Sequence, residues 1–461
     1  MVNLINRLGR RWSVVLWLLI LLSGAEFIVR GPLRFAHARD FNDFISPYIQ
    51  SKAWVKGIDP YSPANLVRLW PREAQQPEFL EQDLATRNLV LRRGIPTAYP
   101  LTALVVLAPM TVLPWPLAHA VWLSINLLGY AAMGVSLALL IRLRWNEIRT
   151  YVFCAVLLAL APFHTGLAAG SIAIVVVSIA AVVCLAAARR HDILAGTLLA
   201  IAVSLKPQIA LPFLLYFLLC RRWRLAGTAI GFVAVVAALA VLRLKITGGL
   251  WLANYLDDNR ILFSRGSLGD FSEANPIRFG LVNLQVLLYV IVHNRAVANG
   301  LALAAGIIAG LWWLFLLCRR SANGQQLLAL SALVVISLLP VYHRLYDASL
   351  LAFPLAWSLT ELPGRVRRLA NIAFCLILPF LVPGGTLLEQ IELRGYVNAA
   401  VRSAWWWKAL VMPHQVWVLA ILSVVLLVAM RWTANQPSGG LDRFRFGKDE
   451  TEHLASGPGT V

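Results

Sequence analysis

Apolar stretches of about 20 residues recur along almost the whole chain, and this feature limits the possible folds more than any other. Of the 461 residues, 59% are hydrophobic and 14% are charged, whereas a soluble protein carries roughly 25% charged residues. A water-exposed surface with so few charges would contain large apolar patches. The composition therefore excludes a soluble enzyme, a disordered chain and a secreted disulfide scaffold. It predicts an all-α polytopic membrane protein.

The net charge of +19 comes from basic residues that stand in short clusters between the apolar stretches. Nucleic-acid-binding proteins carry such residues as a patch or stripe, so we expect no nucleic-acid partner. In a membrane protein, basic clusters mark the cytoplasmic side. The clusters expected there are Arg10-Arg11, Arg142/Arg144/Arg149, Arg189-Arg190, Arg221-Arg222/Arg224, Arg319-Arg320, Arg365/Arg367/Arg368 and, in the polar tail, Arg443/Arg445/Lys448.

With these clusters in the cytoplasm, we expect about 12 transmembrane helices, with an uncertainty of about two, and both termini inside. They form one membrane domain over residues 1–435, and the polar tail 436–461 is expected to be disordered. The first apolar run resembles a signal peptide without a cleavage site, so we expect a retained helix. The expected spans are about 13–30, 117–141, 147–163, 170–188, 192–205, 207–220, 225–245, 298–318, 325–340, 347–361, 368–382 and 410–430.

Two further apolar runs, about 101–113 and 279–293, are too short to cross a membrane, so we expect interfacial or re-entrant helices there. The remaining polar residues gather on the outer side, where function is therefore to be sought. That side holds the long loop 31–98, the loops 246–278 and 382–409, and the turns at Lys206 and at Tyr342–Tyr346.

No metal or cofactor is expected. The five cysteines stand in apolar segments without CxxC spacing. Asp257-Asp258-Asn259 could contribute to a metal site, but spacing indicates no third ligand, and we interpret them as part of a solvated loop. The chain has neither a Walker A motif nor a dinucleotide GxGxxG motif, so a nucleotide-driven pump is unsupported.

The first outer loop carries a candidate general base. Residues 44–55 can form an amphipathic helix along the membrane surface, with Tyr48 suited to the interface. Asp43 precedes this helix, where partial desolvation would raise its basicity toward a hydroxyl group. The commoner alternative is that Asp40, Asn42 or Asp43 caps the helix. Gly57-Ile-Asp-Pro-Tyr61 is typical of a turn, with Asp59 as a second acid the less common alternative.

Two later groups could bind a phosphate. Lys206 stands before Pro207, which breaks a helix, and a cation at such a break near the headgroups suits a phosphate. The alternative is a snorkelling lysine. His343 and Arg344 can bind phosphate as a pair, while Asp347 caps the next helix or orients His343. An ordinary loop with a capping aspartate is the alternative here.

Several motifs together carry a resemblance to a known family. Asp43-Phe44 is followed by Tyr48 and Gly57-x-Asp-Pro-Tyr61, and Tyr99-Pro100-Leu-Thr comes next. A second stretch runs from Gly170 through Arg189-Arg190 and Leu194-Ala-Gly196 to Leu205-Lys-Pro-Gln208 and Arg221-Arg222-Trp-Arg224. Over about residues 35–360 the chain resembles glycosyltransferase family 87. It departs from the family pattern at Gly170-Ser171-Ile172-Ala173, where the family often has Gly-Gln-x-Asn, and at Leu101, where the family has a second proline.

The resemblance implies a GT-C fold and an inverting transfer on the extracytoplasmic face of the inner (plasma) membrane. The donor would be a polyprenyl-phosphate sugar, with mannose favoured and arabinose possible, and the acceptor a hydroxyl of a lipid-linked or cell-envelope glycan. Asp43 matches the family's catalytic base, and Lys206, His343 and Arg344 are the implied partners of the donor phosphate. The candidate substrate-binding residues are Asp40, Tyr48, Asp59, Tyr61, Tyr99, Gln208, Tyr346 and Asp347.

The main alternative is a transporter or flippase of a lipid-linked or small-molecule substrate. Transporters place ionisable residues or broken helices near the bilayer midplane. The candidates in this chain, Glu26, Lys206 and Asp347, all fall near predicted outer ends of helices. The charge distribution therefore favours the transferase.

Overall fold

Helices make up nearly all of the chain that the structure describes. The structure is a computed structural model that describes residues 9–38, 43–74, 99–145, 147–247, 250–319, 326–360, 362 and 364–434. Within these ranges the only β-type pairing is an isolated antiparallel bridge between Leu281 and Arg344. The tail 436–461 and Asp40 lie outside the described residues. The prediction of an all-α protein is confirmed.

Within the described residues, six helical segments are long and apolar enough to cross a membrane. They are Val14–His37, Trp115–Leu140, Trp223–Lys245, Arg295–Cys318, Gly364–Leu393 and His414–Thr433. The corresponding helices are α2 (Gly9–Arg30), α3 (Pro32–His37), α9 (Trp115–Leu140), α15 (Trp223–Thr247), α18 (Arg295–Cys318), α21 (Gly364–Ile377), α22 (Gly384–Leu393) and α24 (His414–Ala434). The chain is thus a multi-pass membrane protein.

Length separates these spans from the other apolar helices. Helices α10 and α11 meet at an angle of 42° and count as one further span if they are taken together. A helix of 12 to 17 residues is about 18–26 Å long, which is short of the roughly 30 Å hydrocarbon core. The shorter elements are α8 (Leu101–Leu107), α10 (Ile148–Ala159), α11 (Ala161–Ala169), α12 (Ile172–Ala188), α13 (Asp192–Leu205), α14 (Pro207–Leu219), α19 (Gln326–Ser337) and α20 (Ala352–Ser358).

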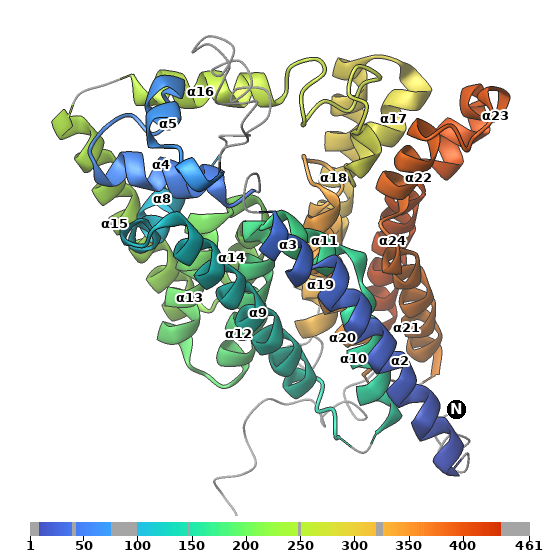
Figure 1. The fold of residues 1–461 in the computed structure, drawn as a ribbon. Coiled ribbons are helices and arrows are strands. Elements are labelled where there is room, and N and C mark those ends of the chain that lie inside the picture. The colour runs from blue at the N-terminus through green and yellow to red at the C-terminus, as the bar shows by residue number, and fades with distance from the viewer. Residues whose placement is uncertain are drawn as a thin grey trace, which may run out of the picture.

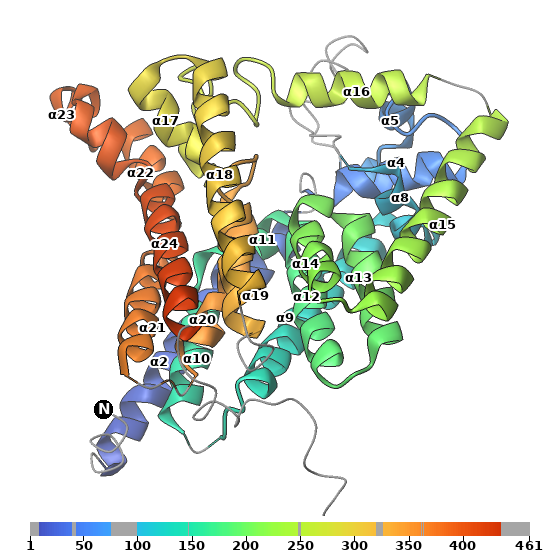
Figure 2. The ribbon, with the colours of Figure 1, turned by 180° about the vertical axis from the view of Figure 1, so that it is seen from behind.

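The short helices α12, α19 and α20 lie in the interior of the bundle. Helix α12 is apolar over its whole length and nearly all of it is buried, as expected of a helix without a polar face. It packs against α9 on one side and α13 on another, and α13 packs in turn against α15. A second group pairs α24 with α21, α19 and α18, and α2 with α10 (Figures 1 and 2).

One end of the molecule carries several short helices that lie beyond the long ones. Figure 1 shows α16 (Trp251–Leu262), α17 (Leu284–Val292), α22 and α23 (Ala399–Ser403) at this end, opposite to the N-terminus. The predicted short elements at 101–113 and 279–293 are present, and neither is long enough to span. The remaining helical elements of the described residues, at various places in the fold, are α4 (Ile45–Val55), α5 (Pro63–Leu69), a π-helical turn (Trp407–Val411) and the 3-10 turns η1 (Arg72–Ala74), η2 (Ala108–Val112), η3 (Arg278–Gly280), η4 (Leu345–Leu351) and η5 (Leu378–Leu381).

The helix predicted over 44–55 is present, and most of it is covered by protein. Helix α4 forms over these residues, but Ile45 to Ser51 are all buried. It packs against α8 and η2, and the Tyr48 hydroxyl donates to the carbonyl of Leu113 at 2.8 Å. The indole of Trp54 donates to the carbonyl of Ala240 in α15 at 3.1 Å. The helix is therefore held inside the protein on both faces.

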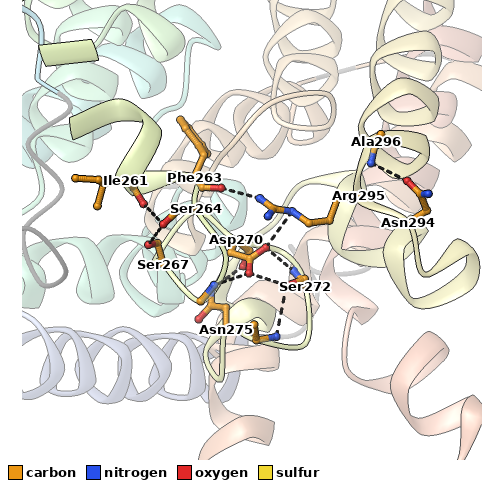
Figure 3. Close-up of polar contacts among 12 residues, drawn as sticks. Ile261, Phe263, Ser264, Ser267, Asp270, Ser272, Asn275, Asn294, Arg295 and Ala296 are labelled. Carbon is orange, nitrogen blue, oxygen red and sulfur yellow. Dashed lines mark hydrogen bonds and ion pairs between the residues drawn. The ribbon is translucent and has the colours of Figure 1, made fainter. Parts of the chain in front are cut away.

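The prediction of a solvated loop over 246–278 is wrong in part. Asp257-Asp258-Asn259 lie on helix α16, and Asp258 is buried. The following turn is cross-linked around Asp270, which accepts hydrogen bonds from Gly266 N, Ser272 N and Ser272 Oγ (Figure 3). Arg295 of α18 lies 3.5 Å from this carboxylate and donates to the carbonyl of Phe263 at 2.6 Å. Although burial alone would raise the pKa of Asp270, these hydrogen bonds lower it.

Candidate active site

Four separate segments bring polar side chains together beside the interior helices. Asp43 comes just before α4, Tyr99 just before α8, and Lys206 between α13 and α14. The fourth segment, residues 342–347, links α19 to η4. These segments are far apart in the sequence. Lys206 and Asp347 are separated by 141 residues, yet their side chains form an ion pair.

Asp347 is the buried centre of this cluster. Its Oδ1 lies 2.5 Å from Lys206 Nζ, and its Oδ2 lies 3.1 Å from His343 Nδ1. The backbone N–H of Arg344 also donates to Oδ2 at 3.1 Å. The Asp347 side chain is only 1% exposed, so these donors replace the water that a carboxylate would otherwise bind. Both predicted uses of Asp347, as a helix cap and as a partner of His343, occur together.

Lys206 lies at a helix break, as predicted. Helix α13 ends at Leu205 and α14 begins at Pro207, because proline fits the first turn of a helix but not its interior. The ammonium contacts Asp347 and lies 4.9 Å from the centre of the Tyr346 ring. The side chain is 11% exposed. A snorkelling lysine would place its charge in water, so that alternative is wrong.

Asp43 is the carboxylate on the accessible side of the cluster. Its side chain is partly exposed, and its backbone N–H donates to the carbonyl of Ala169 at 2.7 Å. Tyr346 hydrogen-bonds to the carboxylate, and Arg344 in turn hydrogen-bonds to Tyr346. Phe44 is the N-cap residue of α4, so Asp43 does not occupy the capping position.

The surroundings of Asp43 act on its pKa in opposite directions. Burial among protein atoms disfavours the charged form and raises the pKa, whereas Arg344 and Lys206 lower it. The hydrogen bond from Tyr346 also lowers it. The net effect is a pKa above the ordinary value of 3.8. Such a carboxylate is a stronger base than a solvated aspartate once it is ionised.

Three tyrosines, Tyr99, Tyr342 and Tyr346, surround the accessible side of Asp43, and all three are partly exposed. Burial and the nearby carboxylates raise the pKa of Tyr99 well above 10, and burial raises the pKa of Tyr342 to about 12. The hydroxyls of Tyr99 and Tyr342 therefore stay protonated and can donate hydrogen bonds to a substrate. Tyr342 was not among the predicted site residues. The sequence could have indicated it, because Tyr342 stands beside His343 in the densest polar segment late in the chain.

The segment that carries His343 and Arg344 is supported by residues 279–282 and by α22. Val282 N donates to the carbonyl of His343 at 3.0 Å, next to the bridge between Leu281 and Arg344. Phe279 N in turn donates to Glu389 Oε1 of α22 at 2.7 Å. Sequence patterns did not indicate this support, because an isolated bridge has no periodicity to detect.

Several predicted site residues lie apart from this cluster. Asp59 forms the predicted turn, in which Tyr61 N donates to its Oδ1 at 2.9 Å, and Asn254 Nδ2 of α16 donates to its Oδ2 at 2.6 Å. Tyr61 hydrogen-bonds to the carbonyl of Tyr99 at 2.8 Å, which places it behind the site. Tyr48 contacts Leu113, and Gln208 is exposed on α14. In the described ranges no group of three or more His, Cys, Asp or Glu side chains could hold a metal ion.

Comparison with known proteins adds one finding. Residues 97–354, which are more than half of the chain, match the model of glycosyltransferase family 87. No curated protein and no solved structure matches the chain. The matched range includes Lys206 and the segment 342–347, whereas Asp43 precedes it.

Proposed function

The chain belongs to glycosyltransferase family 87, and from this membership we propose that it transfers a sugar from a polyprenyl-phosphate donor to a hydroxyl of a glycan or glycolipid. The reaction takes place on the extracytoplasmic face of the inner membrane and inverts the anomeric centre. Mannose is the favoured sugar. The proposed fold is of GT-C type with about 12 spans; six helical segments of the described residues, and a seventh if the bent pair is taken as one, are long enough to cross a membrane.

The observation that carries this proposal is the position of Asp43 next to Arg344 and Tyr346. An acceptor hydroxyl that attacks the anomeric carbon must lose a proton, and Asp43 is the partly exposed carboxylate that can take it. The polyprenyl phosphate that leaves gains negative charge in the same step. Arg344 and Lys206, which both act on Asp43 electrostatically, are the cations that can stabilise this charge.

The three proposed phosphate-binding residues then have different tasks. Arg344 is partly exposed, so its guanidinium makes the direct contact with the phosphate. Lys206 and His343 are buried and both bind Asp347. Lys206 adds positive charge from behind, and both residues hold the segment that carries Arg344. Tyr99 and Tyr342 donate hydrogen bonds to the sugar or the phosphate, while Tyr346 keeps its hydrogen bond to Asp43.

One observation favours the transporter or flippase instead. The ion pair of Lys206 and Asp347 is buried at a break between two apolar helices, and transporters often place ionisable groups at such breaks. A transporter moves its substrate across the bilayer without breaking the bond between sugar and phosphate. The two functions therefore differ in a product that can be measured.

The test uses the full-length protein in liposomes that contain radiolabelled polyprenyl-phosphate-mannose and an envelope lipid extract as acceptor. We expect labelled glycan and free polyprenyl phosphate in equal amounts. A parallel sample with polyprenyl-phosphate-arabinose tests the sugar. Movement of intact donor across the bilayer, without release of polyprenyl phosphate from either donor, would support the flippase and overturn the transferase.

The pH dependence of transfer gives a further prediction. Asp43 must be ionised to act as a base, so transfer should fall as the pH drops through its raised pKa, above 3.8. Arg344→Gln removes a cation that lowers this pKa, so the acidic limb of the pH–rate profile should move to higher pH. The control Arg260→Gln changes an exposed arginine of α16 and should leave the limb in place. An unmoved limb in Arg344→Gln would contradict the coupling.

A further inference from the structure

Two series of contacts hold the backbone at Asp43, and both include the indole ring of Trp122. We propose that Trp122 is a positioning residue, which fixes the Asp43 carboxylate against Tyr346 and Arg344; this inference rests on the proposed function. Trp122 lies on α9 and is 2% exposed. It reaches Asp43 through two routes that meet at its indole ring.

The first route runs through the backbone at the end of α11. The last carbonyls of a helix have no partner within it, and Asp43 N–H takes up one of them, that of Ala169, at 2.7 Å. The next residue, Gly170, ends the helix with φ +69°, a left-handed conformation that glycine adopts without strain. Its carbonyl accepts a hydrogen bond from Trp122 Nε1 at 3.0 Å.

The second route runs through Phe44, the residue that follows Asp43. The rings of Phe44 and Trp122 are stacked, with centroids 4.3 Å apart and an angle of 4° between their planes. Trp115, which lies two turns before Trp122 on the same helix, also stacks on Phe44, at 5.9 Å. Phe44 is fully buried, so a rotation of the chain at Asp43 would break this stack in a close-packed region.

Helix α11 also positions the other half of the site. Gly166 precedes Ala169 by three residues, and positions three apart lie on the same side of a helix. A Cβ atom on Gly166 would lie 3.1 Å from the Cβ of Tyr346, so the backbone of α11 and Tyr346 are in close contact. One helix thus sets the distance between the base and the tyrosine that hydrogen-bonds to it, and Trp122 holds the base to that helix.

The chain provides a matched control. Trp313 on α18 is also 2% exposed, and its Nε1 donates to a backbone carbonyl, that of Ala329, at 2.9 Å. Trp122→Phe and Trp313→Phe each remove one indole hydrogen bond and keep an aromatic ring. A general loss of stability should affect both variants alike. Only Trp122→Phe should affect the position of Asp43.

We expect Trp122→Phe to lower kcat for transfer roughly 10- to 100-fold, because small displacements of a catalytic group are costly. KM for the donor should change less than about twofold, since Arg344 and Lys206 come from other segments. The acidic limb of the pH–rate profile should move to higher pH as Asp43 moves away from the groups that lower its pKa. Phe44→Leu, which removes the stacked ring, should act in the same direction, and Trp313→Phe should resemble the unmodified protein.

Equal kcat values and equal acidic limbs for Trp122→Phe and Trp313→Phe would overturn the inference. Asp43→Asn, measured beside them, separates this failure from failure of the proposed function. If Asp43→Asn loses transfer while Trp122→Phe matches Trp313→Phe, the positioning role alone is wrong. If folded Asp43→Asn keeps full transfer, Asp43 is not the base, and both the mechanism and the role of Trp122 are overturned.

Discussion

Asp43→Asn is expected to reduce the rate of sugar transfer by about 10²- to 10⁴-fold, the usual contribution of a general base. The amide has nearly the same shape as the carboxylate and can keep the hydrogen bond from Tyr346, but it cannot accept the proton of the acceptor hydroxyl. Because Arg344 and Lys206 remain, binding of the donor phosphate should persist. The loss should therefore fall on kcat and leave KM for the donor nearly unchanged.

The measurement is a steady-state transfer assay in liposomes with increasing donor. Asp257→Asn is the control, because it makes the same chemical change on α16, at a residue that the proposed mechanism does not use. Asp43→Glu should retain part of the activity, since it keeps a carboxylate at a displaced position. Transfer at the unmodified rate by a correctly folded Asp43→Asn variant would remove Asp43 from the mechanism.

Lys206→Met is expected to lower the free energy of unfolding by about 3–5 kcal/mol, the usual cost of removing one partner of a buried ion pair. The substitution leaves the Asp347 carboxylate, 1% exposed, without its ammonium partner at 2.5 Å. His343 Nδ1 and Arg344 N still bind Asp347, but they do not replace the positive charge of the lysine. Transfer should also fall, because the same segment carries Arg344.

A matched pair near the end of α2 gives the control. Arg30 and Glu26 are also 2.5 Å apart, but their side chains are 33% and 38% exposed. Arg30→Met should therefore cost less than Lys206→Met, because the partners of the pair are only partly buried. The midpoints of denaturant unfolding in mixed micelles compare the two variants. Equal losses for Lys206→Met and Arg30→Met would show that burial does not strengthen the pair of Lys206 and Asp347.

Lys206→Met combined with Asp347→Asn extends this test. The neutral amide removes the uncompensated charge while its oxygen can still accept from Arg344 N. We expect this double variant to recover a large part of the stability that Lys206→Met loses, whereas transfer stays low. A double variant no more stable than Lys206→Met would mean that packing around the lysine stem, not the charge, accounts for the loss.

The sequence by itself determined the helical architecture, because apolar runs and prolines act locally. The expected segment 192–205 matches α13, and the break at Lys206 follows from Pro207, which cannot continue the preceding helix. The span expected at 117–141 matches α9, Trp115–Leu140, to within two residues. The polar segment at 342–347 was identified for the same reason, since its composition differs sharply from the apolar helices around it.

The sequence was less informative about which faces are covered. An apolar face on a short segment such as α4 predicts burial on one side, in lipid or in protein. Only the tertiary structure decided that α8 and η2 cover it, together with α15, so that Tyr48 and Ile49 are buried. The sequence pattern of one helix does not indicate which other segment covers its second face.

The tertiary structure alone decided the composition of the site. Asp43, Lys206 and Asp347 belong to segments that are far apart in the chain, and no local propensity relates them. They meet because the interior helices bury the backbone on which each stands, and because Asp347 must find cationic and N–H partners once it is removed from water. Trp122 belongs to the same class. Its proposed role depends on contacts between the end of α11, the start of α4 and α9, which only the tertiary structure brings together.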